Sequence, residues 1–113
     1  MPHINHLRLH RKQWALSQSQ MAHLVGIKAR SVISSYELGT CSPGVRFALA
    51  YQFIFGVQLA ALFPGLAQEV EDEVMQRAAA LDRTCRYKDD PASVKVRELL
   101  QAMVARSAND GGA

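Results

Sequence analysis

The stretch SQSQMAHLVGIKARSVISSYELG, residues 17–39, carries the pattern that decides the fold. Ser17 suits the N-cap of a helix that begins at Gln18, because its hydroxyl can accept a free backbone N–H of the first turn. Three apolar residues of this helix recur at helical spacing on one face: Met21, Leu24 and Val25. Gly26 readily adopts the left-handed conformation with which many helices end. The stretch therefore predicts a helix that stops at a glycine turn.

A second helix is expected after a short connection. Ile33 and Tyr36 stand three residues apart and are expected as its buried anchors. Four residues of the same helix then face solvent: Arg30, Ser31, Ser34 and Ser35. A short polar helix with one cation suits the DNA major groove, where hydrogen bonds to base edges carry the sequence information.

These paired helices resemble the helix-turn-helix of the Cro and phage-repressor type, also called the XRE family, whose members bind operator DNA. The resemblance runs over residues 5–63 through NHLRLHRKQWALSQSQMAHLVG, ISSYELG and SPGVRFALAYQFIFGVQLAALFP, roughly half of the chain. It implies an all-α fold in which a five-helix, phage-repressor-like DNA-binding domain occupies residues 1–64.

Three further helices of that domain can be placed by their apolar residues and turns. The first is expected over residues 5–15, with Ile4, Leu7 and Trp14 facing inward. The fourth is expected over residues 45–55 and carries five apolar side chains: Phe47, Leu49, Ala50, Phe53 and Ile54. A short fifth helix over residues 59–63 precedes Pro64.

The turn between the paired helices departs from the family pattern, since Gly26 and Ile33 are one residue further apart than usual. Val32 would restore the spacing, but Ser35 would then be the second anchor. Burying its hydroxyl without a partner costs about 1 to 3 kcal/mol. We therefore place the extra residue in the turn, which leaves the first residue of the reading helix open among three positions: Lys28, Ala29 and Arg30.

Charge is distributed unevenly along the chain. The first 56 residues hold six basic residues and a single acid, Glu37, for a net charge of +5, whereas the remainder sums to −2. A basic half suits a polyanion such as double-stranded DNA, because neutralising phosphates releases counterions. A solvated basic face without a partner is the alternative interpretation.

Seven residues are candidate DNA contacts: Gln18, Lys28, Arg30, Ser31, Ser34, Ser35 and Arg46. Arg30 is the first choice for base recognition, because a guanidinium can bind O6 and N7 of guanine together; a phosphate contact is the alternative. Lys28 suits phosphate as a flexible point charge. If the motif docks as in the family, Gln18 faces a phosphate, with simple helix capping as the alternative. Arg46 is open between phosphate contact and a surface role.

The family resemblance also implies one structural ion pair. In similar proteins, the glutamate at the position of Glu37 pairs with an arginine of the first helix. Arg11 lies at the matching place, seven residues before Gln18. We therefore expect an Arg11 to Glu37 pair that braces the first helix against the reading helix.

Residues 65–106 predict a helical extension that dimerises or stabilises the domain. One helix carries an apolar stripe: Leu66, Val70, Val74, Ala78 and Leu81. After a polar connector over residues 83–90, Asp90 and Pro91 form a helix-start signal. The last helix again has an apolar side: Val96, Leu99, Leu100, Met103 and Val104. Residues 107–113 are expected as a flexible tail.

Other classes of function lack support in the sequence. His6 and His10 could share a metal, but two histidines without a third ligand usually face solvent. Cys41 and Cys85 are too few for a disulfide framework or a zinc site. No catalytic constellation, phosphate-binding loop, secretory signal or membrane-spanning run is present, so we expect a cytoplasmic, nucleoid-associated protein without cofactor.

These patterns together predict a sequence-specific DNA-binding transcriptional regulator. The simplest form is a homodimeric repressor that binds a palindromic operator, with recognition helices one DNA turn, about 34 Å, apart. An antitoxin or adaptor is the alternative. In that case the C-terminal helices bind a partner protein, and DNA binding is autoregulatory or vestigial.

Overall fold

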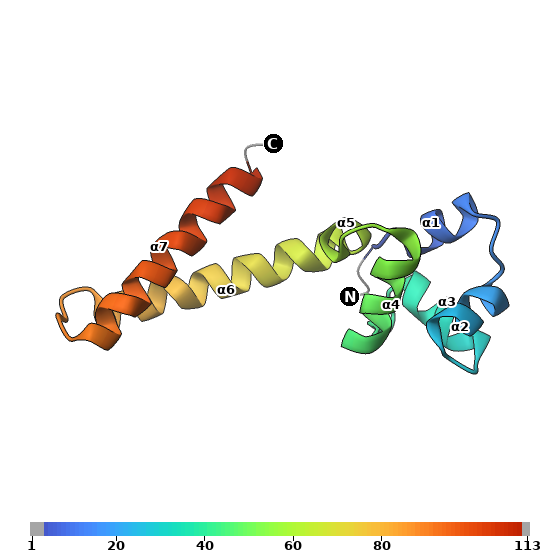
Figure 1. Cartoon of the computed structure of the whole chain (residues 1–113), viewed down its shortest axis with the longest axis horizontal. Coiled ribbons are helices and arrows are strands. Elements are labelled where there is room, and N and C mark those ends of the chain that lie inside the picture. Colours follow the sequence, from blue (N-terminus) through green and yellow to red (C-terminus); the bar gives the residue numbers. More distant parts are fainter. Residues whose placement is uncertain (1–3, 112–113) are drawn as a thin grey trace. The chain divides into compact units, whose positions relative to one another are not determined.

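The computed structural model describes residues 4–111 and folds them into seven α-helices with no strand among them (Figure 1). The expected all-α class is therefore confirmed. The chain forms two compact units, one ending at Glu69 and the other beginning at Val70. Within the described range, no helix combines the length and the apolar character needed to cross a bilayer.

The first unit is built from five helices and the start of a sixth: α1 (Leu7–Gln13), α2 (Gln18–Val25), α3 (Arg30–Leu38), α4 (Val45–Phe55), α5 (Leu59–Leu62) and α6 (Pro64–Cys85). Its core contains side chains from each of the first five: Leu7, Met21, Ala22, Val25, Ile33, Tyr36, Tyr51 and Leu62. Burial of these apolar groups is the main favourable term that holds the unit together.

Helix α1 is shorter than predicted at both ends. The side-chain oxygen of Asn5 accepts the backbone N–H of Leu7 at 3.0 Å, so Asn5 stands before the helix rather than in it. At the other end, Ala15 adopts a left-handed conformation with φ 57°. The backbone N–H of Leu16 then donates to the carbonyl of Arg11 at 3.2 Å and closes the helix.

Two residues flanking α1 were wrongly predicted to be buried. Trp14 was expected inside, but it lies beyond the last helical turn and is 64% exposed. Ile4, also expected inside, precedes the helix and is exposed. Only Leu7 of the three predicted inward residues is buried.

Helix α2 begins and ends as predicted. The Ser17 hydroxyl accepts from the N–H of Gln20 at 3.0 Å, and the Gln20 side chain accepts in return from the Ser17 N–H at 2.9 Å. Gly26 ends the helix with φ 93°. The buried face differs, because it follows Met21, Ala22 and Val25. Leu24 lies beside that face and is exposed, contrary to the prediction.

Helix α4 has the predicted bounds, but its buried face centres on Tyr51, which the sequence analysis did not assign to the core. The Tyr51 ring contacts those of Tyr36 and Phe55, with centroids 6.5 Å and 6.0 Å away. Phe53, two residues from Tyr51, points away from this cluster and is 89% exposed. Leu49 is exposed for the same reason.

The second unit contains most of α6 and all of α7 (Pro91–Gly111). Helix α7 starts as predicted, with Pro91 in its first position and the Asp90 carboxylate accepting the Ser93 N–H at 3.1 Å. Two boundaries differ. Helix α6 continues to Cys85, which shortens the connector to residues 86–90, and α7 continues to Gly111, where a flexible tail was expected from residue 107. The rest of that predicted tail, residues 112–113, lies outside the described residues.

The longer α7 is bonded to α6 near its C-terminal end. The Ser107 hydroxyl donates to a carboxylate oxygen of Glu71 on α6 at 2.6 Å. This bond ties α7 to α6 at the residue where the sequence predicts the tail to begin.

Candidate nucleic-acid interface

Helices α2 and α3 pack against each other across a short turn (Figure 1). The N–H groups of Gly26 and Ile27 both donate to the Ala22 carbonyl at 2.9 Å, which closes α2. Ile27 then packs against the core, whereas Lys28 is exposed at the tip of the turn. The turn spans residues 26–29, and Ile33 and Tyr36 are the buried residues of α3, as expected.

Helix α3 begins at Arg30, which answers the question of its first residue. Ala29 is the N-cap in extended conformation, and no side chain caps the helix. The first N–H groups of a helix lack intrahelical acceptors and carry partial positive charge. Because Arg30 and Ser31 are exposed in this first turn, an anion would find both backbone donors and a guanidinium there.

Two grooves meet at Arg30. One, of about 410 Å³, runs along α2 and the turn and includes Ser19, His23 and Lys28. The other, of about 560 Å³, lies between α1, the start of α2 and α3. Besides Arg30 it is lined by seven polar side chains: Arg8, Arg11, Lys12, Ser17, Gln18, Ser34 and Glu37. Arg30 lines both, so it stands at the centre of a basic surface.

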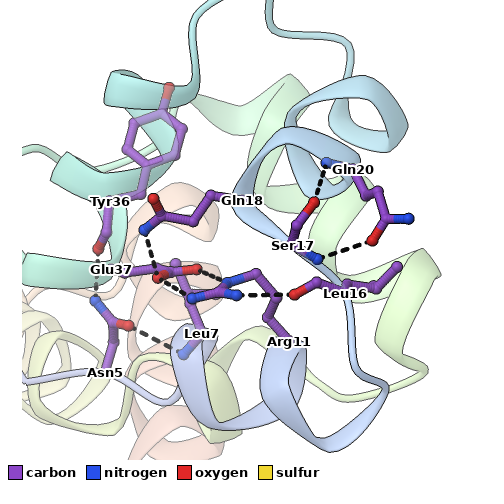
Figure 2. Close-up of polar contacts among 9 residues, drawn as sticks. All are labelled: Asn5, Leu7, Arg11, Leu16, Ser17, Gln18, Gln20, Tyr36 and Glu37. Atoms are coloured by element: carbon purple, nitrogen blue, oxygen red, sulfur yellow. Dashed lines mark hydrogen bonds and ion pairs between the residues drawn. The ribbon is translucent and has the colours of Figure 1, made fainter.

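The ion pair expected between Arg11 and Glu37 is present (Figure 2). Arg11 Nε lies 2.6 Å from Glu37 Oε2, and Arg11 Nη2 lies 3.0 Å from Oε1. The two side chains are only 9% and 4% exposed. The hydrogen bond to Glu37 raises the pKa of Arg11 despite burial, so the guanidinium stays charged.

Sequestering Glu37 has a consequence for the whole surface. Glu37 is the only acid in the first 56 residues. With its charge neutralised inside, the exposed charged side chains of residues 4–56 are all cationic: Arg8, Lys12, Lys28, Arg30 and Arg46. This part of the protein therefore presents a field of one sign.

The candidate contacts from the sequence analysis differ in how free their polar atoms are. Gln18 directs its Nε2 to Glu37 Oε1 at 3.2 Å, so it takes part in the ion-pair network (Figure 2). The Ser35 hydroxyl donates to the Ser31 carbonyl at 3.2 Å, which engages it within the helix. Ser34 is half-buried in the second groove. Arg46 is exposed on α4, outside both grooves.

Two functional candidates were missed, namely Arg8 and Lys12. From the sequence, Arg8 and Lys12 entered only the net charge of the first half. Their i, i+4 spacing places them on one face of α1, and that signal was available. What the sequence did not show is that this face borders the same groove as Arg30.

The remaining candidate ligands are the histidines, cysteines and acids of the described residues. Over residues 4–111, no group of three or more histidine, cysteine or acidic side chains is placed to hold a metal ion. Cys41 and Cys85 are free thiols. Comparison with protein-family models, with curated proteins and with solved structures finds no match.

Proposed function

We propose that the protein is a sequence-specific DNA-binding transcriptional regulator in which α2, the turn and α3 form a helix-turn-helix. The observation that carries this proposal is the charge of the surface: residues 4–56 expose cations and bury their single acid. DNA presents closely spaced phosphates, and cationic contacts supply a large share of protein–DNA affinity.

In the proposed complex, α3 enters the major groove with its first turn leading. Arg30 reads a base, because a bidentate contact to guanine contributes about 1–3 kcal/mol of discrimination. Ser31 and Ser34 are exposed or groove-lining hydroxyls that can bond to bases or backbone. Ser35 is assigned a lesser role, since its hydroxyl is already bonded within α3.

Phosphates are bound by the cations around Arg30. Lys28 lies in the turn, and Arg8 with Lys12 lies across the second groove on α1. The Arg11 to Glu37 pair joins α1 to α3 and so keeps these α1 cations at a fixed distance from the reading helix. Arg46 on α4 is a further candidate for a phosphate contact. The salt dependence of DNA affinity in an Arg46→Ala variant tests it.

We propose further that the regulator acts as a homodimer. Two recognition helices one DNA turn apart, about 34 Å, would read a palindrome and double the number of contacts. Occupancy of such an operator represses transcription by excluding other proteins from the promoter. The second unit supplies the dimer contact.

The experiment that tests this function is selection of bound duplexes from random DNA, with the full chain, across a salt series. The wild type is expected to enrich a palindrome, and Arg30→Ala is expected to lose preference at one position of each half-site. Arg83→Ala, an exposed cation of the second unit, is the matched control and should leave the selected motif unchanged. Binding without enrichment would contradict sequence-specific recognition.

A further inference from the structure

Helices α6 and α7 form an antiparallel hairpin whose register is set at both ends (Figure 1). At the open end, Ser107 bonds Glu71 at 2.6 Å. At the closed end, Nη1 of Arg97 donates to the carbonyl of Cys85 at 2.5 Å. Near the open end, a residue of α6 and a residue of α7 lie at the same height along the hairpin when they are equally far from the Ser107 to Glu71 bond. The contact at the closed end is made by the long Arg97 side chain, which reaches along the hairpin to the Cys85 carbonyl.

The side of α6 that meets α7 is regular. Its residues are spaced four and three apart, as in a coiled-coil seam: Glu71, Met75, Ala78, Asp82 and Cys85. On α7 the matching positions include Ser93, Arg97, Leu100 and Ser107. Among the described residues of the second unit, only Cys85, Ser93 and Leu100 are buried. The hairpin therefore has very little core of its own.

Most of the apolar stripe that the sequence predicts for α6 lies beside this seam. Val70, Val74 and Leu81 each precede a seam residue by one position, and they are 48%, 39% and 46% exposed. On α7, Val96 and Leu99 likewise precede Arg97 and Leu100. In two antiparallel helices, the residues that directly precede the seam residues point to the same side of the pair. These residues of α6 and α7 therefore share one side of the hairpin.

A shallow groove confirms that the two helices share this side. It measures about 220 Å³, and Val74 of α6 lines it together with Met103 and Arg106 of α7. We call the surface of six apolar residues the hairpin face: Val70, Val74, Leu81, Val96, Leu99 and Met103. A larger groove of about 400 Å³ along the hairpin is lined by Asp82, Gln101 and five apolar residues: Met75, Ala78, Ala79, Leu100 and Val104.

We propose that the hairpin face binds the same face of a second copy and forms a four-helix bundle. Its two-fold axis runs parallel to the helices, so that α6 of one copy lies on α7 of the other. The inference rests on the proposed function only in that such a dimer brings two DNA-binding units together. Two stacked hairpins would bury on both sides the apolar face that one hairpin leaves in water.

The charges at the edges of the face specify the second copy and its orientation. Glu73, beside Val74, contacts Arg77 of its own helix at 3.9 Å and is half-exposed. Arg106 lies on the same side, next to the Ser107 that bonds α6. Glu73 and Arg106 therefore lie at nearly the same height along the hairpin. Rotation about an axis parallel to the helices leaves the height of each residue along the hairpin unchanged. It therefore places Glu73 against the second copy's Arg106, twice per dimer.

The other two-fold arrangement brings like charges together. With the axis across the helices, α7 would lie antiparallel on the second copy's α7. Lys95 and Arg106 lie five and six residues on either side of Leu100. Lys95 is four residues before Leu99, so the two share the outer edge of the hairpin face. With the axis at the height of Leu100, Lys95 would face the second copy's Arg106, also twice, and like charges at an interface are unfavourable. Lys95 also contacts Glu98 of its own helix at 3.6 Å, as Glu73 contacts Arg77.

The test is a charge reversal followed by sedimentation velocity of the full chain without DNA. Glu73→Arg and Arg106→Glu are each expected to raise the dimer dissociation constant at least about fivefold, because two pairs become repulsive in each dimer. The double variant restores opposite charges and should recover most of the wild-type affinity. Arg83→Ala is the control, since Arg83 is an exposed cation of α6 two residues past Leu81, on the side of the helix away from the hairpin face.

Val74→Asp tests the apolar part of the interface and should abolish dimerisation with unchanged helix content by circular dichroism. A wild type that is monomeric at micromolar concentration, a double variant that stays as weak as the single ones, or a monomer that copurifies in equal amounts with another protein would each overturn the inference. A monomer that still selects a half-site would leave the DNA-binding proposal standing. A dimer that binds no DNA would refute that proposal alone.

Discussion

The guanidinium of Arg11 on α1 contacts both carboxylate oxygens of Glu37 on α3, at 2.6 Å and 3.0 Å (Figure 2). Its third nitrogen, Nη1, donates to the Leu16 carbonyl at 2.8 Å. Nearby, the Asn5 side chain donates to the Tyr36 carbonyl at 2.8 Å. These polar contacts join α1, α3 and the segment before α2, so the pair fixes the geometry of the proposed DNA-binding surface.

Arg11→Ala should therefore lower the free energy of unfolding by about 3 kcal/mol, because removal of one partner leaves a buried carboxylate without its counter-charge. Urea denaturation followed by circular dichroism measures the loss. The double variant Arg11→Met with Glu37→Gln removes both charges and should be less destabilised than the single one. An Arg11→Ala variant that unfolds like the wild type would refute the structural role of the pair.

Tyr51 offers a test of the core. Its hydroxyl is buried and has no hydrogen-bond partner among the described residues. Tyr51→Phe removes this unsatisfied group and should leave stability unchanged or raise it by about 1 kcal/mol. Thermal unfolding measures the change. Tyr87→Phe, at an exposed tyrosine, is the control, and a Tyr51→Phe loss above about 1 kcal/mol would imply an unseen partner for the hydroxyl.

Burial raises the pKa of Tyr51 above its ordinary value of 10.0. Above pH 10 the Tyr51 hydroxyl ionises in the unfolded chain but stays neutral in the folded protein. The contribution of Tyr51 to the free energy of unfolding is therefore fully present below pH 10 and is lost as the pH rises beyond it. The stability of the wild type should therefore fall more steeply above pH 10 than that of Tyr51→Phe. Equal slopes for the two proteins would contradict this reading of the core.

The predictions that succeeded depend on local chemistry. The Ser17 cap, the Gly26 turn and the Asp90 to Pro91 helix start each involve residues within a few positions of one another. Their physical causes, a short hydrogen bond or a permitted backbone angle, act regardless of the remaining chain. The same holds for the bounds of α4, which Gly56 ends with φ 67°.

The predictions that failed depend on which neighbour each side chain meets. Trp14 and Phe53 are large apolar residues at positions compatible with an inward face, yet the helices around them pack elsewhere. The spacing of apolar residues shows which of them share a helix face, but not which part of that face a neighbouring helix covers. On α6, Val70 and Val74 belong to the predicted apolar stripe and yet remain exposed. The groove shared by Arg8 and Arg30 likewise arises only when α1 packs against α3.

That groove leads to a prediction for DNA affinity. Arg8→Ala and Lys12→Ala should weaken binding to all sequences and lower the slope of log affinity against log salt by about 1 each, because each removes one phosphate contact. Fluorescence anisotropy over a salt series measures the slope. Arg46→Ala reports in the same assay whether α4 also reaches a phosphate, and Arg83→Ala is the control. A change in base preference with either α1 variant would assign that residue to the major groove instead.

Asp90 provides a pH-dependent test of the second unit. Hydrogen bonds from the side chain and backbone N–H of Ser93 hold the pKa of Asp90 below its ordinary value of 3.8. A lowered pKa in the folded state stabilises the protein above pH 3.8, and this contribution is lost as the pH falls through the still lower folded value. Asp90→Ala should therefore reduce the thermal stability of the hairpin at neutral pH by an amount that stays constant down to about pH 4 and shrinks below it. Asp89→Ala, one residue before the cap, is the matched control and should have little effect. If both variants lose the same stability at every pH, the Asp90 cap does not support α7.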